Sequence, residues 1–349
     1  MNVPIYQVDA LASKLFGGNP AAICPLDDWL PNATMQAIAA ENNLAETAFY
    51  ISKNGKYHLR WFTPGVEVDL CGHATLATAH VMMDIRREVS GRVAFESRSG
   101  ELSVTRDGDL YALDFPARPP VERKVAPKLF DALGATPKLV LGARDLFCVF
   151  DTEAEVRALK PNMERLAAVD SFATIVTAPG TDCDFVSRFF APAQGIPEDP
   201  VTGSAHCTLI PYWAARLGKT KLFARQVSPR GGEIWCEDRG GRVTIAGRAV
   251  KYLEGTIVVS YQDAVVCPLP DGRGSVAEPP CVSMRTGGQD CLKELKGPRL
   301  SVCHLRHRSG LSASRIGDGG CSGTHRLRGG ISRSANLLRA ARVQQRVSR

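Results

Sequence analysis

Hydrophobic and polar residues alternate over many short stretches in the first 262 residues of this chain. An alternation with period two is typical of strands that bury one face of a sheet. Turns rich in Gly, Pro, Asn and Asp separate these stretches. The predicted strands comprise residues 3–8, 21–24, 44–51, 57–62, 139–141, 146–150, 173–177, 183–190, 233–236, 242–245, 249–253 and 255–260, with two or three more over 93–113.

Helical periodicity, with apolar residues three or four positions apart, is confined to fewer segments. The predicted helices comprise residues 31–42, 74–83, 126–133, 153–159 and 162–169, and a last one that begins at 202–204 and ends near 217. The second and the last of these are apolar over most of their length. Many strands around two such helices favour an α+β fold of curved, mostly antiparallel half-barrel sheets over a doubly wound parallel sheet.

An internal repeat relates the two apolar helices. Residues 60–64 (RWFTP) and 188–192 (RFFAP) share the pattern Arg-x-Phe-x-Pro. Each copy continues through a turn to a glycine, Gly72 or Gly203, followed by a histidine and an apolar run. The interval from the Arg to this Gly is 12 residues in the first copy and 15 in the second. The repeat predicts two similar half-domains that contribute to one shared site.

The two helix starts, at Gly72 and at Gly203 with Ser204, are candidates for binding an anion. Backbone N–H groups in the first turn of a helix have no partner within the helix and carry partial positive charge. They are therefore suited to a carboxylate or to the oxygen of an enolate.

Proline density over residues 114–120 predicts a domain boundary. We expect domains over residues 1–117 and 118–262, followed by a low-complexity basic tail over 263–349. The formal net charge of +7 divides into −2 before residue 263 and +9 after it. The nearly neutral first part gives no electrostatic reason to expect nucleic acid binding. The tail is rich in Arg, Gly and Ser, which predicts disorder, and it lacks the interleaved aromatic residues of a nucleic-acid-binding segment.

Eleven cysteines are many for 349 residues, and six of them lie before residue 263. These six form no C-x-x-C pair and no Cys/His spacing typical of zinc, so we expect free thiols in a reducing cytoplasm and no metal site. No Gly-rich phosphate loop follows a strand, so we expect no nucleotide and no other cofactor. The first residues lack the pattern of a signal peptide, and no apolar run approaches the ~20 residues of a membrane span. We therefore expect a cytoplasmic protein without a membrane partner.

Two side chains are candidates for acid/base chemistry. Glu46 is the one carboxylate in the apolar stretch 44–51, so it is either an edge-facing residue or a buried acid. His73 follows Gly72 at a predicted helix start, where it is well placed to donate to a ligand.

Residues 16–20 (FGGNP) form a turn between two predicted strands. Glycine pairs permit positive φ and a close approach of the backbone. The segment is either an ordinary hairpin turn or a substrate-binding loop to which Gly18 and Asn19 contribute.

Five motifs follow one another in the first three quarters of the chain. They are residues 16–20 (FGGNP), 43–49 (NLAETAF), 60–64 (RWFTP), 67–75 (EVDLCGHAT) and 198–205 (EDPVTGSA). In this combination the chain resembles the PhzF-like family of phenazine-biosynthesis isomerases, which are related in fold to diaminopimelate epimerase and proline racemase. The resemblance implies two pseudo-symmetric domains, each a curved sheet wrapped round a central helix, with the site in the cleft. It also implies a homodimer.

The resemblance further implies a role for each matched position. Glu46 corresponds to the acid/base that moves a proton between two carbons of a cyclic dienol acid. His73 and Asp199 correspond to polar groups that bind the substrate and assist this proton movement. Gly72 and Ser204 correspond to positions at the two helix starts that hold the substrate carboxylate.

Two residues bear on which reaction of this fold is expected. The family usually has Ser before the catalytic Glu, and Ala45 stands there in this chain, so the hydroxyl that would help to orient a substrate is missing. Epimerases of this fold use two opposed thiols, and the corresponding residues here are Cys71 and Thr202. A threonine hydroxyl is a far weaker base than a thiolate, whose parent thiol has a pKa of about 8.5. Two-thiol epimerisation is therefore disfavoured.

The sequence thus favours a cofactor-independent, biosynthetic isomerase that acts on a small carboxylate by proton transfer at Glu46. Three alternatives remain open. One is a racemase or epimerase that uses Cys71 with a different partner, and another is a non-catalytic protein that binds small acids. The third is a cysteine hydrolase built on Cys71 and His73, for which the sequence reveals no orienting third group.

Overall fold

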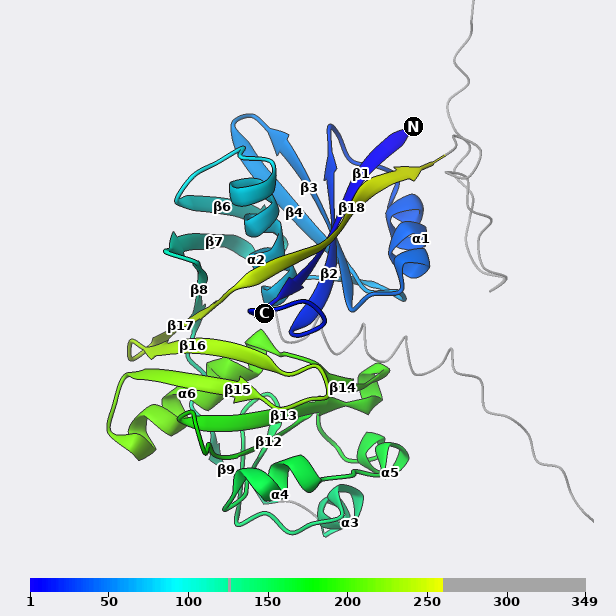
Figure 1. Ribbon diagram of the computed structural model, residues 1–349. Helices are drawn as coiled ribbons and strands as arrows, with labels where there is room; N and C mark the ends of the chain where they lie inside the picture. Colours follow the sequence, from blue (N-terminus) through cyan, green and yellow to red (C-terminus); the bar gives the residue numbers. More distant parts are fainter. Residues whose placement is uncertain (125–126, 260–349) are drawn as a thin grey trace, which may run out of the picture. The chain divides into compact units, whose positions relative to one another are not determined.

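The computed structural model describes residues 1–124 and 127–259, so the predictions for the tail over 263–349 lie outside the described residues (Figure 1). Strands dominate, in agreement with the predicted α+β class. In the first half the elements are β1 (Asn2–Ala10), β2 (Asn19–Leu26), α1 (Asn32–Asn42), β3 (Glu46–Lys53), β4 (Lys56–Phe62), β5 (Glu67–Val68), α2 (Gly72–His80), a π-helical turn (Val81–Ile85), β6 (Arg92–Ser97), β7 (Gly100–Asp107), β8 (Leu110–Pro116) and β9 (Val121–Glu122).

The second half repeats this plan with two extra short helices. Its elements are α3 (Lys128–Leu133), β10 (Leu139–Gly142), β11 (Leu146–Val149), α4 (Glu153–Ala158), α5 (Met163–Ala167), β12 (Thr174–Pro179), β13 (Phe185–Ala191), a 3-10 turn (Pro192–Gln194), β14 (Ile196–Asp199), α6 (Gly203–Leu217), β15 (Lys221–Gln226), β16 (Gly232–Asp238), β17 (Arg242–Gly247) and β18 (Ala249–Val258).

Strand pairing follows the same order in both halves. In the first half β1, β2, β3, β4, β6, β7 and β8 are successive neighbours, and in the second half β10, β11, β12, β13, β15, β16 and β17 are. The parallel pairs occur at matching places, namely β2 with β3 and β4 with β6, against β11 with β12 and β13 with β15. All other pairs are antiparallel, which confirms the predicted mostly antiparallel sheets and the internal repeat.

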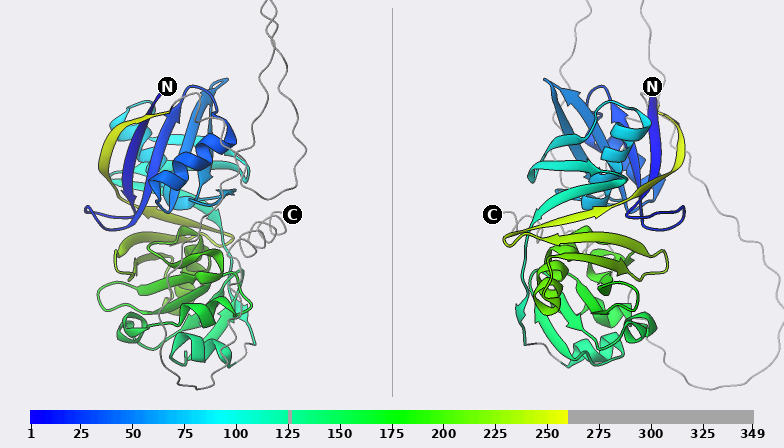
Figure 2. Two further views of the ribbon diagram at one scale, coloured as in Figure 1. Left: turned by 90° about the vertical axis from the view of Figure 1, so that its right-hand side faces the viewer. Right: turned by 60° about the vertical axis from the view of Figure 1, so that its left-hand side comes forward.

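The halves are joined by strands that cross between them. β8 pairs with β17 in antiparallel register, so the last repeated strands of the two halves are neighbours. Each half then sends one further strand to the other: β9 pairs with β10, and β18 pairs with β1 along nearly its whole length. Both views of Figure 2 show β18, in yellow, beside β1, in dark blue. Each half-sheet is therefore completed by a strand from the other half.

A bidentate ion pair occupies the same place in each repeat. The Arg60 guanidinium donates to Glu67 at 2.7 and 2.9 Å, and the Arg188 guanidinium donates to Glu198 at the same distances. Each Glu stands five residues before the helix-start glycine. The three residues by which the second copy is longer lie between Pro192 and Glu198, where the chain forms a 3-10 turn that begins at Pro192.

The central helices α2 and α6 are buried in one hydrophobic core that contains residues of both halves (Figure 1). Their N-termini approach each other closely, because a Cβ on Gly203 would lie 3.9 Å from the Cα of Gly72. Pro211 lies inside α6 and cannot donate to the carbonyl of Cys207 four residues earlier. The backbone N–H of Arg118, in the link between the halves, donates to that carbonyl at 2.8 Å.

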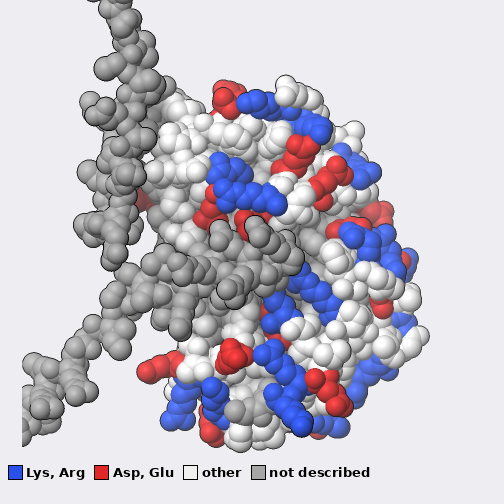
Figure 3. Space-filling model, turned by 180° about the vertical axis from the view of Figure 1, so that it is seen from behind, with Lys and Arg blue, Asp and Glu red and all other residues white. Residues whose placement is uncertain are grey.

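Basic and acidic side chains alternate on the face of the described residues seen in Figure 3. None of the described helices combines the length and apolar character needed to cross a membrane.

Candidate functional site

Glu46 and His73 meet where β3 begins and α2 begins. Their side chains are 15% and 7% exposed, and Glu46 Oε2 lies 3.1 Å from His73 Nε2. The two atoms are within ion-pair distance, and neither has any other hydrogen-bond partner. A buried polar atom without a partner is costly, so this pair is arranged to face a further group.

Cys71, the residue before α2, lies on the other side of the imidazole. Its Sγ is 3.6 Å from His73 Nδ1. Burial disfavours the imidazolium form of His73, but the Cys71 sulfur and the Glu46 carboxylate outweigh this effect and raise the pKa of His73 above its ordinary value. This direction favours a protonated imidazole beside the Glu46 carboxylate.

The thiol of Cys71 is poorly suited to act as a nucleophile. The structure does supply the third group that the sequence did not reveal, because Cys71, His73 and Glu46 form a chain of the kind found in cysteine hydrolases. Burial, followed by the charge of Glu46, raises the pKa of the Cys71 thiol. Activated cysteines have lowered pKa values and are partly exposed, whereas Cys71 is 7% exposed. The hydrolase alternative is therefore disfavoured.

Asp199 ends β14, just before the second helix start. Its Oδ1 accepts a hydrogen bond from Asn19 Nδ2 at 2.8 Å, and its Oδ2 accepts one from the Thr202 hydroxyl. Loss of hydration raises the pKa of Asp199 to about 6, with opposing contributions from His73 and from these two donors, while Glu46 adds to the increase. The electrostatic coupling to Glu46 and His73 means that the fold brings the three predicted catalytic residues together.

Gln226, at the end of β15, was not identified from the sequence. It is 1% exposed, and its amide oxygen accepts from the backbone N–H of Thr202 at 2.9 Å. Its amide nitrogen donates to the carbonyl of Asp199 at 2.7 Å and to Thr202 Oγ1 at 3.3 Å. Gln226 therefore holds both ends of the turn that carries Asp199. A lone glutamine in a strand gives no sequence signal for such a role.

Arg144 is a second residue that the sequence did not indicate. Its Nη2 donates to Ser204 Oγ at 3.2 Å, and its guanidinium also makes a bidentate pair with the buried Asp145. The guanidinium lies 4.6 Å from the centre of the Phe172 ring, which helps to fix its position. A held cation therefore stands beside the N-terminus of α6, at the position predicted to bind a carboxylate.

The predicted substrate-binding turn at residues 16–20 lies between β1 and β2 and is hydrogen-bonded to the second half. Gly18 has φ +64°, and a Cβ there would lie 2.1 Å from the Ala10 carbonyl oxygen, so only glycine fits. Its N–H donates to the carbonyl of Gly231 and its carbonyl accepts from Arg230. Both polar groups of Gly18 are thus used within the protein, and its predicted contact with substrate stays a prediction.

Asn19, in the same turn, is wholly buried. Besides its contact with Asp199, its amide nitrogen donates to the carbonyl of Val201 at 2.9 Å, and its Oδ1 has no partner. In this arrangement Asn19 positions Asp199 from the other half of the molecule. Its predicted contact with substrate also stays a prediction.

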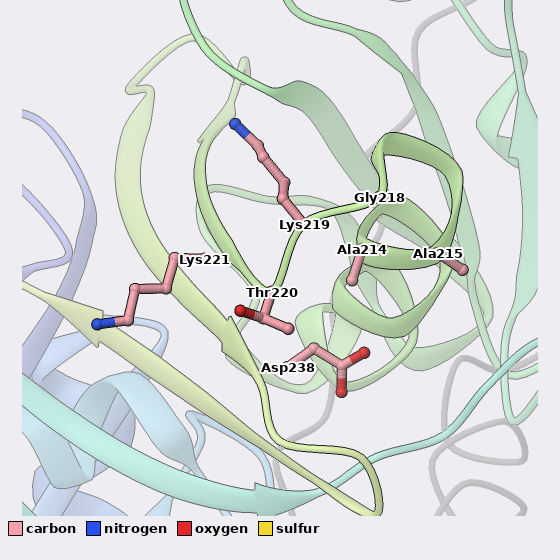
Figure 4. A pocket seen from close by; sticks show the side chains of 7 residues that line it. All are labelled: Ala214, Ala215, Gly218, Lys219, Thr220, Lys221 and Asp238. Atoms are coloured by element: carbon pink, nitrogen blue, oxygen red, sulfur yellow. The ribbon is translucent and has the colours of Figure 1, made fainter.

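A surface hollow lies away from these residues, at the opposite end of α6. Figure 4 shows its lining residues Ala214, Ala215, Gly218, Lys219, Thr220, Lys221 and Asp238. With a rise of ~1.5 Å per residue, the far end of a helix of this length is about 20 Å from its start. The hollow holds none of the grouped acid, base and thiol side chains, so the candidate site is the one at the two helix starts.

Comparison with known proteins identifies relatives of this chain. The family model for phenazine biosynthesis-like proteins matches residues 8–255. An uncharacterized isomerase of Pseudomonas aeruginosa is 52% identical over 257 residues, which cover 74% of this chain and 99% of the relative. Another, from Halalkalibacterium halodurans, is 42% identical over 264 residues, covering 74% of this chain and 100% of the relative. The crystal structure of a PhzF-family phenazine biosynthesis protein from Enterococcus faecalis is 48% identical, with a TM-score of 0.73, and covers 74% of this chain and 100% of that one.

Proposed function

Because the chain belongs to the phenazine biosynthesis-like family, we propose that it is a cofactor-independent isomerase that moves a proton between two carbons of a small carboxylate. The observation that carries the proposal is the Glu46–His73 pair. Two buried polar atoms 3.1 Å apart, neither of them hydrogen-bonded, stand beside two facing helix N-termini.

The helix starts supply the binding of the substrate carboxylate. The N-termini at Gly72 and Gly203 offer unpaired N–H groups and positive potential from two directions. Arg144, whose charge is balanced by its pair with Asp145, adds a further hydrogen-bond donor beside Ser204. A carboxylate bound here would place the carbon next to it near Glu46.

Glu46 acts in this proposal as the base and then as the acid. It removes a proton from carbon, the electron pair moves into the conjugated system, and the same carboxyl returns the proton at another carbon. The cation on His73 and the helix N-termini stabilise the negative charge that develops on oxygen. Positioned acid/base groups of this kind typically contribute about 10²–10⁴-fold to rate.

The contacts of Thr202 support a mechanism with one base on carbon. An epimerase of this fold would need a second base at this position, but the Thr202 hydroxyl donates its hydrogen to Asp199 and receives one from Gln226. Such a hydroxyl fixes Asp199 and has no free lone pair of sufficient basicity for a carbon acid.

The test is solvent deuterium incorporation, followed by proton NMR in D₂O. The unmodified protein would be incubated with a panel of cyclic dienoic, amino and hydroxy acids. We expect Glu46→Gln to lower the rate of incorporation by about 10²–10⁴-fold, and Glu41→Gln, a change at an exposed residue of α1, to leave it unchanged. Incorporation at the unmodified rate in a folded Glu46→Gln protein would exclude Glu46 as the base. Incorporation confined to the α-carbon of amino acids, with inversion, would favour the epimerase alternative.

A further inference from the structure

We propose that Glu46, Cys71 and His73 form a binding site for a borderline-soft divalent cation such as Zn²⁺, whose occupation blocks the acid/base carboxylate. Binding itself is independent of the proposed function, whereas the blocking effect rests on it. Glu46 lies at the start of β3, whereas Cys71 and His73 lie at the start of α2. Glu46 is much farther from the other two in sequence than paired ligands are in zinc motifs. Their spacing accordingly gave no metal signal.

The distances suit a single ion. One ligand atom from each residue lies within 4.8 Å of the other two. Zn²⁺ is held at about 2.0–2.3 Å by nitrogen, oxygen and sulfur ligands, which in a tetrahedral site places neighbouring ligand atoms about 3.3–3.7 Å apart. The Glu46–His73 separation of 3.1 Å, measured to Nε2, is close to these values. The Cys71 sulfur lies 3.6 Å from Nδ1, the other ring nitrogen, and only one of the two nitrogens can bind the ion. A turn of the imidazole ring or of the Cys71 side chain would bring the sulfur, one ring nitrogen and the carboxylate onto one centre.

Binding would displace the protons of the Cys71 thiol and of His73, because a metal ligand has to be deprotonated. His73 is only 6% exposed. Neither its Nε2 nor Glu46 Oε2 has a hydrogen-bond partner. An ion between these atoms would give each a partner. Sulfur, nitrogen and one carboxylate oxygen are ligands that favour Zn²⁺ over Mg²⁺, which prefers oxygen alone. Three protein ligands leave a fourth position open.

A second group of possible ligands provides a natural control. Glu153, Asp182 and Cys183 also lie within 4.8 Å of one another. There, however, Glu153 accepts from Arg157 and from the backbone of Thr181, and Asp182 is paired with Arg225. These carboxylates are already neutralised, so we expect no binding of comparable strength at this place.

The experiment is calorimetric titration of the full chain with Zn²⁺ alone, repeated with Co²⁺ to detect thiolate coordination by its absorption band. We expect Cys71→Ala to lower the binding stoichiometry by one ion, or to weaken the affinity of one site at least 10-fold. The Co²⁺–thiolate absorption of that site should be lost with it. Cys183→Ala should leave both unchanged, and Mg²⁺ should not bind at the site. Because cysteines after residue 262 can bind Zn²⁺, the result is the difference between variants.

Equal stoichiometry, affinity and absorption in the unmodified protein and Cys71→Ala would overturn the proposal, as would the absence of any binding. Thermal unfolding without metal verifies that each variant is folded, and Cys71→Ser provides a second variant if Cys71→Ala is not. Deuterium incorporation measured in the presence of a chelator reports on the proposed function separately. If that exchange fails while Zn²⁺ binding depends on Cys71, the function is wrong and the metal site stands.

Discussion

The two helix-start turns share a scaffold and differ in their chemistry. In both, an Arg–Glu pair fixes the turn, a glycine begins the helix, and a side chain one turn into the helix bonds to the carbonyl of the residue before that glycine. In the first turn that side chain is Thr75, which donates to Cys71, and in the second it is His206, which bonds to Thr202. The repeated residues therefore build the frame of the site.

The side chains that differ between the turns face the site. A thiol in the first turn, Cys71, corresponds to the hydroxyl of Thr202, and His73 corresponds to Ser204. Asp199 pairs with Phe189 in the second half, and Val68 pairs with Trp61 at the matching place in the first half. Asp199 therefore corresponds to Val68. The first turn thus carries the candidate cation, which faces the candidate base Glu46 of β3, and the second carries an acid with its positioning network. The comparison teaches that the repeat preserved structure while each half acquired one part of the chemistry.

The largest expected effect is on stability, and it differs between the arginines of the two Arg–Glu pairs, Arg188 and Arg60. Arg188 is the only described cation paired with Glu198, and it also donates to the carbonyls of Val156 and Leu159. We expect Arg188→Met to lower the free energy of unfolding by about 3 kcal/mol, because a largely buried carboxylate loses its partner. Chemical denaturation would measure this.

Arg60→Met is the matched variant, with an expected cost of about 1 kcal/mol. Its partner Glu67 keeps a second cation, since Arg98 lies 2.8 Å away. Equal costs for the two variants would show that Arg98 does not compensate. The double variant Arg188→Met with Glu198→Gln should recover part of the loss, because no charge is then left unpaired.

A smaller effect of opposite sign is expected at Asp199. Its pKa is raised to about 6, so between pH about 4 and 6 the folded protein retains a proton that the unfolded chain has released. Stability contributed by this carboxyl is therefore lost as the pH rises through that window. We expect Asp199→Asn to stabilise the fold at pH 7 by about 1–3 kcal/mol, and to have little effect at pH 4.

Thermal unfolding from pH 4 to pH 8 would measure this difference. Asp27→Asn, at an exposed position, is the control and should show no such pH dependence. A destabilised Asp199→Asn protein at pH 7 would mean that the hydrogen bonds from Asn19 and Thr202 outweigh the cost of burying the carboxylate.

The smallest expected effect concerns Thr202. Removing a donor to a carboxylate raises the carboxyl pKa, so Thr202→Val should shift the titration of Asp199 upward by about 0.5–1 unit. Carbon-13 NMR of the aspartate carboxyls would detect the shift without a substrate. Thr202→Ser retains the hydroxyl and should titrate like the unmodified protein. An unchanged titration in Thr202→Val would remove Thr202 from the positioning network.

Much of this frame was predictable because it depends on local patterns. The Arg-x-Phe-x-Pro repeat and the helix-start glycines correctly indicated two related halves. The predicted helix over 31–42 is confirmed as α1, and the strand over 44–51 as β3, shifted by two residues. The homodimer, the domain boundaries and the catalytic roles stay predictions.

The features that were missed depend on contacts between distant segments. Gln226 and Arg144 stand in ordinary strand and turn contexts, and their roles arise only from the side chains that folding brings to them. The two histidines that follow the glycines seemed equivalent in the repeat. His73 faces Glu46, whereas His206 is fully buried with its pKa lowered to about 4 by that burial, so only the structure separates them.

The pairing of β1 with β18 has a consequence for the synthesis of the protein. During synthesis β1 has to wait for residues near 258 before its outer edge is paired. The first half therefore cannot complete its sheet until nearly three quarters of the chain has been synthesised. Until then an unpaired edge is available for association with other chains. A stop after β17 would leave that edge permanently open, and such a truncated chain should aggregate even though every residue of the candidate site is present.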